Sequence, residues 1–232
     1  MMPLLVLFDI DGTLLRPCGL GRRSLDDTFS ELYGHRGVFD GVRFHGRTDP
    51  EILGDGLRSV GAPSTDFERV VECYLVRLEE EVRNGPSLTL PGVRDVLLAL
   101  AARGDVVLGL VTGNVRRGAE IKLTRDHLWS FFPVGAFGDD DADRTHLIRI
   151  ARERAETERG EGFSDNRVYY IGDTERDTER DTERDVEAAR GGGAVAIAVA
   201  TGSMDADRLA EERPDHLLTS LEGASGLLEV LP

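Results

Sequence analysis

Two aspartates that follow an apolar run, Asp9 and Asp11, have the types and spacing best suited to chemistry. The run at residues 4–8 is typical of a buried strand, and side chains two apart on a strand share a face. Both carboxylates are therefore expected in one small volume at the carboxyl end of this strand. Two anions so close repel each other, and the usual remedies are a shared proton or a divalent cation. The alternative is a strand end whose two acids simply face water.

Further polar residues follow other predicted strands. Thr112 ends the apolar run at 106–111, and Asp173 follows the run at 168–171. Ligands of parallel α/β sheets bind beyond the carboxyl ends of the strands. We therefore expect Thr112 and Asp173 to lie beside the two N-terminal aspartates.

The elements that position these residues alternate along the chain. Strands are predicted at 4–8, 106–111, 134–137, 168–171, 194–199 and 216–218, with helices between most of them. This alternation predicts an α/β fold: a Rossmann-like parallel sheet with helices on both faces.

A helical segment interrupts the alternation after the first strand. Its predicted helices run from Arg22 to Tyr33 with Gly34 as the stop, from a capping box at Thr48, and from a similar box at Thr65. Beyond it, Pro91 is expected in the first turn of a helix that Gly104 ends. We predict a core domain of residues 1–15 and 89–232 and an inserted α-helical cap subdomain of residues 16–88.

Composition excludes several classes of protein. The formal charge of −15 over 232 residues leaves no basic face for nucleic acid. Two cysteines, Cys18 and Cys73, give neither a disulfide framework nor a zinc pattern. The N-terminal apolar run is too short for a signal peptide, and no window is long enough for a membrane span. We expect a cytoplasmic protein that binds neither nucleic acid nor a membrane.

Three motifs give the chain a family resemblance. Phe8-Asp9-Ile10-Asp11-Gly12-Thr13, Val111-Thr112-Gly113-Asn114 and Ile171-Gly172-Asp173-Thr174 resemble the first, second and fourth motifs of the haloacid dehalogenase-like superfamily. The helical insertion resembles that superfamily's first type of cap. Within the superfamily, the chain looks most like the phosphoglycolate phosphatase-like hydrolases. The resemblance implies a phosphatase for a small phosphomonoester.

Residue chemistry agrees with that expectation. Asp9 can act as the nucleophile and form an aspartyl-phosphate, while Asp11 can protonate the leaving oxygen and later deprotonate water. Thr112 and the amides of Gly113 and Asn114 can bind phosphate oxygens where a helix begins.

A hard cation such as Mg²⁺ would be held by carboxylate oxygens, with Asp173 as the obvious ligand after Asp9. The resemblance adds the main-chain carbonyl of Asp11.

The third motif of the superfamily is a Lys or Arg that opens a helix after a short strand. We assign it to Arg144, which can pair with phosphate and hold the nucleophile's charge in place. The rival is Lys122, which we interpret as a surface residue whose stem covers an apolar stripe.

The fourth motif runs into a tetrapeptide, Thr-Glu-Arg-Asp, that occurs three times between residues 174 and 185. By resemblance, a second acid lies four residues after Asp173, which names Asp177, while the helix that should follow it names Asp185. We favour Asp177 as a metal ligand, because it stays near the fixed strand end. Two copies are expected to be a dispensable, solvated protrusion.

The leading hypothesis is a Mg²⁺-dependent phosphatase, monomeric or homodimeric, whose partner is a small phosphorylated metabolite. Alternatives are a phosphomutase of the same superfamily and a non-catalytic module that binds phosphoesters or metal. A dehalogenase is disfavoured because it needs no second acid such as Asp11. Arg47, before a cap helix, is either part of the helix start or a contact for a second anionic group of the substrate.

Overall fold

The computed structural model describes residues 3–16, 18–44, 46–173, 185–201 and 206–232. Its centre is a six-stranded sheet in the order β3-β2-β1-β4-β5-β6, with every neighbouring pair parallel. The predicted Rossmann-like α/β fold is confirmed. The strands are β1 (Leu4–Phe8), β2 (Val106–Val111), β3 (Val134–Ala136), β4 (Val168–Gly172), β5 (Val195–Val199) and β6 (His216–Leu218).

Helices cover both faces of the sheet, which explains why its central strands are apolar without alternation. The even-numbered side chains of β1 face α4 (Val93–Ala101), α5 (Arg116–Thr124) and α9 (Ser225–Val230). Its odd-numbered side chains, Leu5 and Leu7, pack against α6 (Arg144–Arg159) and α7 (Asp185–Gly191). A short α8 (Ala206–Glu211) contacts β6.

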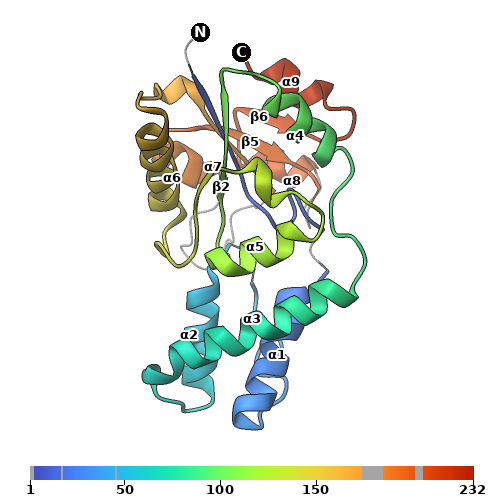
Figure 1. Cartoon of the computed structure of the whole chain (residues 1–232), viewed down its shortest axis with the longest axis vertical. Coiled ribbons are helices and arrows are strands. Elements are labelled where there is room, and N and C mark those ends of the chain that lie inside the picture. The colour runs from blue at the N-terminus through green and yellow to red at the C-terminus, as the bar shows by residue number, and fades with distance from the viewer. Residues whose placement is uncertain (1–2, 17, 45, 174–184, 202–205) are drawn as a thin grey trace.

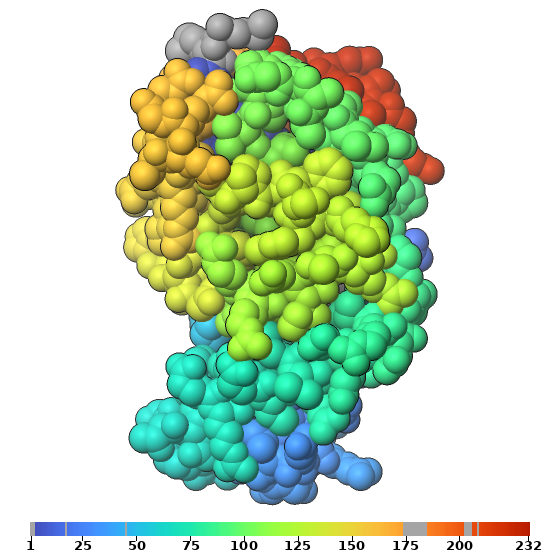
Figure 2. All heavy atoms as spheres, viewed as in Figure 1, coloured from blue at the N-terminus to red at the C-terminus, as the bar shows by residue number. Residues whose placement is uncertain are grey.

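Three helices lie together at one end of the molecule, beyond the carboxyl ends of the strands (Figure 1). They are α1 (Leu20–Tyr33), α2 (Asp49–Ser59) and α3 (Phe67–Asn84), and α3 packs on both of the others. We call them the cap helices. The space-filling view shows α3 lying against α5, so the cap helices contact the helix layer that covers one face of the sheet (Figure 2).

The chain enters and leaves the cap helices through two adjacent segments. The Arg16 amide donates to the Leu88 carbonyl at 2.7 Å, and the Leu90 amide donates to the Leu14 carbonyl at 3.0 Å. Leu15 and Thr89 form an antiparallel bridge between them. The domain bounds 15/16 and 88/89 stay a prediction, and this paired crossing lies at those bounds.

Two of the predicted helix signals are confirmed, and one in the same segment is wrong. The box at Thr48 is complete, because Thr48 and Glu51 each accept from the other's backbone amide, and Gly34 ends α1 in the left-handed region at φ 73°. The box at Thr65 is wrong: Thr65 lies inside a 3₁₀ turn, η1 (Ser64–Asp66), and no side chain caps α3. The turn removes the extended residue that a capping box requires.

The next helix also differs from its prediction. α4 starts at Val93 after the left-handed Gly92 and ends at Ala101, so neither Pro91 nor Gly104 lies at a helix terminus. Two other short 3₁₀ turns, η2 (Trp129–Phe131) and η3 (Asp165–Arg167), precede β3 and β4. In the part of the chain that is described, no helix combines the length and apolarity needed to cross a membrane. The predicted protrusion at 174–185 lies outside the described residues except for Asp185.

Candidate functional site

A cavity of about 440 Å³ lies at the carboxyl ends of β1, β2 and β4, under the cap helices. β1 is central, so chain segments after β1 and its two neighbours meet at this point. The residues that line the cavity include seven predicted site residues: Asp9, Asp11, Thr112, Gly113, Asn114, Arg144 and Asp173.

Asp9 is buried directly after β1. Its Oδ1 accepts from the Ile10 amide at 2.8 Å, and its Oδ2 accepts from Nη1 of Arg144 at 3.1 Å. Burial raises the pKa of Asp9 to about 6, against the attraction of Arg144. The carboxylate is therefore fixed by one backbone donor and one cation.

Arg144 is the first residue of α6 and is itself buried. Its Nη1 also donates to Asp185 at 2.5 Å and lies 3.1 Å from the Tyr170 hydroxyl. Burial alone would lower the pKa of Arg144, but Asp9, Tyr170 and Asp185 raise it well above its ordinary value. The guanidinium therefore remains charged between two acids, and its buried Nε has no partner among the described residues.

Three buried carboxylates, those of Asp9, Asp173 and Asp185, form an acidic cluster whose ligand atoms lie within 4.8 Å of one another. Two glycines provide the space for it. A Cβ on Gly12 would lie 2.1 Å from Asp173 Oδ2, and a Cβ on Gly172 would lie 2.2 Å from Asp185 Oδ2. Hard oxygen donors at this spacing suit a divalent cation.

The sequence offers two candidates, Asp177 and Asp185, for the second acid of the fourth motif. Asp177, which the spacing favours, lies outside the described residues. Asp185 is described: it begins α7, is buried, accepts from the Tyr170 hydroxyl at 2.8 Å and belongs to the acidic cluster. Asp185, which lies eight residues beyond Asp177 in the chain, is therefore close to Asp173 in space.

Asp11 is held by partners different from those of Asp9. Nζ of Lys122 lies 3.0 Å from its Oδ1 and 2.7 Å from its Oδ2, and Nδ2 of Asn114 donates to Oδ2 at 2.8 Å. Burial alone would raise the pKa of Asp11, but Lys122 and Asn114 lower it. Repulsion between the two aspartates is thus relieved by a separate cation for each.

The interpretation of Lys122 as a surface residue is wrong. Lys122 is buried on the inner face of α5. Ala119, three residues earlier, and Leu123, the next residue, are buried on the same face. That spacing places Lys122 on the apolar face of its own helix, which was the signal available in the sequence. A lysine there is stable because carboxylates neutralise it.

The loop after β2 connects the core to the cap helices. Thr112 is buried, and its hydroxyl accepts from Nδ2 of Asn114 at 2.8 Å. The carbonyl of Gly113 accepts from the Asp49 amide at 2.8 Å, and a Cβ on Gly113 would lie 2.4 Å from the Arg47 carbonyl. The second motif is therefore in direct contact with the start of α2.

Two cap residues beside this loop were not identified from the sequence as site residues. Asp49 Oδ2 accepts from the Val115 amide at 3.0 Å and from the Tyr74 hydroxyl at 3.4 Å. Burial raises the pKa of Asp49 to about 6, against the attraction of Lys122. In the sequence Asp49 looked only like a helix-start residue, and nothing indicated what it would face.

Arg47 lines the cavity, and its Nη2 pairs with Asp55 of α2 at 2.6 Å. Arg47 thus contributes to the cavity wall and is anchored to the helix that follows it, α2. Both alternatives for Arg47 remain compatible with this position.

Comparison with known sequences identifies relatives. A family model described as haloacid dehalogenase-like hydrolase matches residues 6–179, and a second model of HAD-hydrolase-like proteins matches residues 144–224. A curated phosphoglycolate phosphatase of Synechococcus elongatus is 35% identical over 147 residues. That match spans 63% of this chain and 61% of the relative, which is less than two thirds of the relative's length.

Solved structures share the fold over nearly the whole chain. CbbY from Rhodobacter sphaeroides, in complex with phosphate, has a TM-score of 0.68 and 21% identity, with 98% of each chain covered. A β-phosphoglucomutase from Clostridium difficile has a TM-score of 0.72 and 12% identity, with 99% of this chain and 96% of that one covered. The family model covers well over half of the sequence, and its motifs converge on one cavity. The chain belongs to the haloacid dehalogenase-like hydrolase family.

Proposed function

We propose that the protein is a Mg²⁺-dependent phosphatase that hydrolyses a small phosphomonoester. One observation carries this proposal: Asp9, a buried carboxylate of the acidic cluster, lines the cavity and is paired with a buried arginine, Arg144. Transfer of a phosphoryl group requires an in-line nucleophile and positive charge around the phosphate oxygens. The 35% identical phosphoglycolate phosphatase supports the same class of substrate.

In the first step, an oxygen of Asp9 forms a bond to phosphorus while the bond from phosphorus to the ester oxygen breaks. In its protonated form, Asp11 gives a proton to that departing oxygen. Thr112 donates its hydroxyl to a phosphate oxygen, and Arg144 keeps the Asp9 side chain in position. The product of this step is an aspartyl-phosphate and a free alcohol.

In the second step, water attacks the phosphorus of the aspartyl-phosphate and the bond to Asp9 breaks. The proton lost by water goes to Asp11, which by then is ionised. Inorganic phosphate is released, and Asp9 returns to its carboxylate form. The cap helices, which roof the cavity, would limit access of bulk water during both steps.

The acidic cluster fits a magnesium ion, because its three buried carboxylates supply hard oxygen donors. We propose Asp9, Asp173 and Asp185 as its ligands, together with the main-chain carbonyl of Asp11. When bound, the ion supplies positive charge that offsets the charge of the phosphate. The variants Asp177→Asn and Asp185→Asn distinguish the two candidates for the second acid of the fourth motif.

Hydrolysis of p-nitrophenyl phosphate with and without Mg²⁺ tests the proposal. Activity should require Mg²⁺ and should be lost in Asp9→Asn and in Asp11→Asn. Equal yields of nitrophenol and inorganic phosphate would identify water as the acceptor, whereas a mutase would need a sugar phosphate. Asp185→Asn should weaken Mg²⁺ binding more than Asp177→Asn does. If the protein binds Mg²⁺ but hydrolyses no ester, the phosphatase proposal is wrong and the protein is a non-catalytic binding module.

A further inference from the structure

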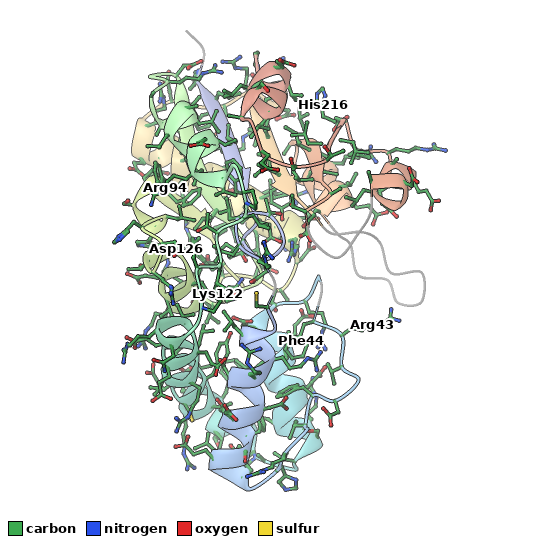
Figure 3. The ribbon with its side chains drawn as sticks, turned by 90° about the vertical axis from the view of Figure 1, so that its right-hand side faces the viewer. Arg43, Phe44, Arg94, Lys122, Asp126 and His216 are labelled. Carbon is green, nitrogen blue, oxygen red and sulfur yellow. The ribbon has the colours of Figure 1, made fainter. Side chains whose placement is uncertain are left out.

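Lys122 is the one lysine among the 28 basic Lys and Arg residues of the sequence. Its side chain is 7% exposed, and it lies where α5 meets the cap helices (Figure 3). An ammonium has three protons to donate. Nζ of Lys122 has three acceptors around it. They are the two carboxylate oxygens of Asp11 and Oδ1 of Asn114, and the distance from Nζ to Oδ1 is 2.6 Å.

These contacts fix the orientation of Asp11. Its side chain is 42% exposed to the cavity, so packing alone does not hold it. Lys122 contacts both oxygens, and Asn114 donates a second hydrogen bond to one of them. Both oxygens of Asp11 therefore have a donor, and these donors fix the plane of the carboxyl group.

The cap helices contribute to the same arrangement. Asp49, at the start of α2, lies close enough to attract Lys122 and is tied to the core through the Val115 amide. Tyr74 of α3 donates to Asp49 from the other side. The ammonium is therefore bound by an acid of the core, Asp11, and attracted by an acid of the cap helices, Asp49.

We propose that Lys122 is a positioning residue for the second half of the reaction, the hydrolysis of the aspartyl-phosphate. By holding both oxygens of ionised Asp11, it directs that carboxylate toward the attacking water. The oxygen of water bonds to phosphorus, the phosphorus–Asp9 bond breaks with its electron pair returning to Asp9, and the released proton goes to Asp11. This role rests on the phosphatase function proposed above.

The first experiment does not depend on turnover. Protein labelled with [¹⁵N]lysine has one lysine side-chain signal, because Lys122 is the single lysine. In the wild type the buried, ion-paired ammonium should exchange its protons slowly and give a resolved signal. Asp11→Asn should shift or abolish this signal. Arg117→Met, which removes an exposed ion pair between Arg117 of α5 and Glu72 of α3, should not. An unchanged signal in Asp11→Asn would overturn the proposal.

The second experiment separates the two half-reactions. Nitrophenolate leaves without needing a proton, so kcat/KM for p-nitrophenyl phosphate reports formation of the aspartyl-phosphate. Lys122→Met should lower kcat by roughly 100-fold while kcat/KM changes little, and mass spectrometry after acid quenching should show phosphate accumulating on Asp9. Lys122→Arg, which keeps the charge, should recover part of kcat, and Arg117→Met should behave as the wild type.

A parallel fall in kcat and kcat/KM, without phosphate on the enzyme, would mean that Lys122 is merely structural and would refute the proposal. A wild-type protein without turnover would instead refute the phosphatase function, and the lysine signal would still test the contact with Asp11. The folding of each variant is checked by urea unfolding.

Discussion

The carboxyl of Asp49 makes the stability of the protein depend on pH in a way that one substitution can isolate. Asp49 links α2 to the core, and burial raises its pKa from 3.8 to about 6. A raised pKa means that the folded protein binds this proton more tightly than the unfolded chain does. Ionisation of Asp49 therefore costs stability, and the cost grows as the pH rises between those two values.

The magnitude follows from the two pKa values. A difference of about 2 pKa units corresponds to about 3 kcal/mol once both states are ionised. About 1.4 kcal/mol of this develops between pH 5 and pH 8, since part of the cost is already present at pH 5. Asp49 also lines the cavity, and screening by water there reduces the expected value to about 1 kcal/mol.

Urea unfolding of the wild type and of Asp49→Asn at pH 5 and pH 8 measures this difference. Asparagine keeps an oxygen for the Val115 amide but carries no charge, so the variant should gain about 1 kcal/mol relative to the wild type between the two pH values. Asp27→Asn, at an exposed position of α1, is the control and should follow the wild type at both. A constant difference between Asp49→Asn and the wild type, or a change of opposite sign, would refute the reasoning.

Three further predictions concern the acidic cluster and the repeat that follows Asp173 in the sequence. Without metal, Arg144→Met should lose about 3 to 5 kcal/mol in urea unfolding, because two buried carboxylates lose their cation; unchanged stability would mean that those carboxylates are protonated. Gly12→Ala should weaken Mg²⁺ binding about 10- to 100-fold in calorimetric titration, since its Cβ would meet Asp173 Oδ2 at 2.1 Å, and wild-type affinity would contradict this close approach. Deletion of residues 174–181, which leaves one Thr-Glu-Arg-Asp copy, should preserve both Tm and phosphatase activity, and loss of activity in a folded protein would show that the repeat is required.

The sheet and half of the site were predictable because their signals are local. Continuous apolar runs end where β1, β2 and β4 end, and the polar residues that follow them converge once the strands are parallel. Arg144 was predictable for the same reason, since it opens the helix after β3. The complete capping box at Thr48 is likewise decided within four residues.

The rest depends on contacts between distant segments. Lys122 faces Asp11, which lies 111 positions earlier, and Asp49 faces Val115, 66 positions later. Whether a lysine on an apolar helix face reaches water or a carboxylate depends on what packs over it, and the helix alone does not contain that information. The sequence did not show that Asp185 lies close to Asp173 for a related reason: the spacing of two residues along the chain does not give their distance in space.

The paired crossing at Leu15 and Thr89 has a mechanical consequence. Hydrogen bonds join the two segments side by side, so we expect them to bend more easily out of the plane of these bonds than within it, where bending would stretch the bonds. The chain enters and leaves the cap helices through this crossing, so we expect the cap helices to move relative to the sheet mainly in that one direction. The attachment therefore selects the path of any cap movement, independently of the residues that line the cavity.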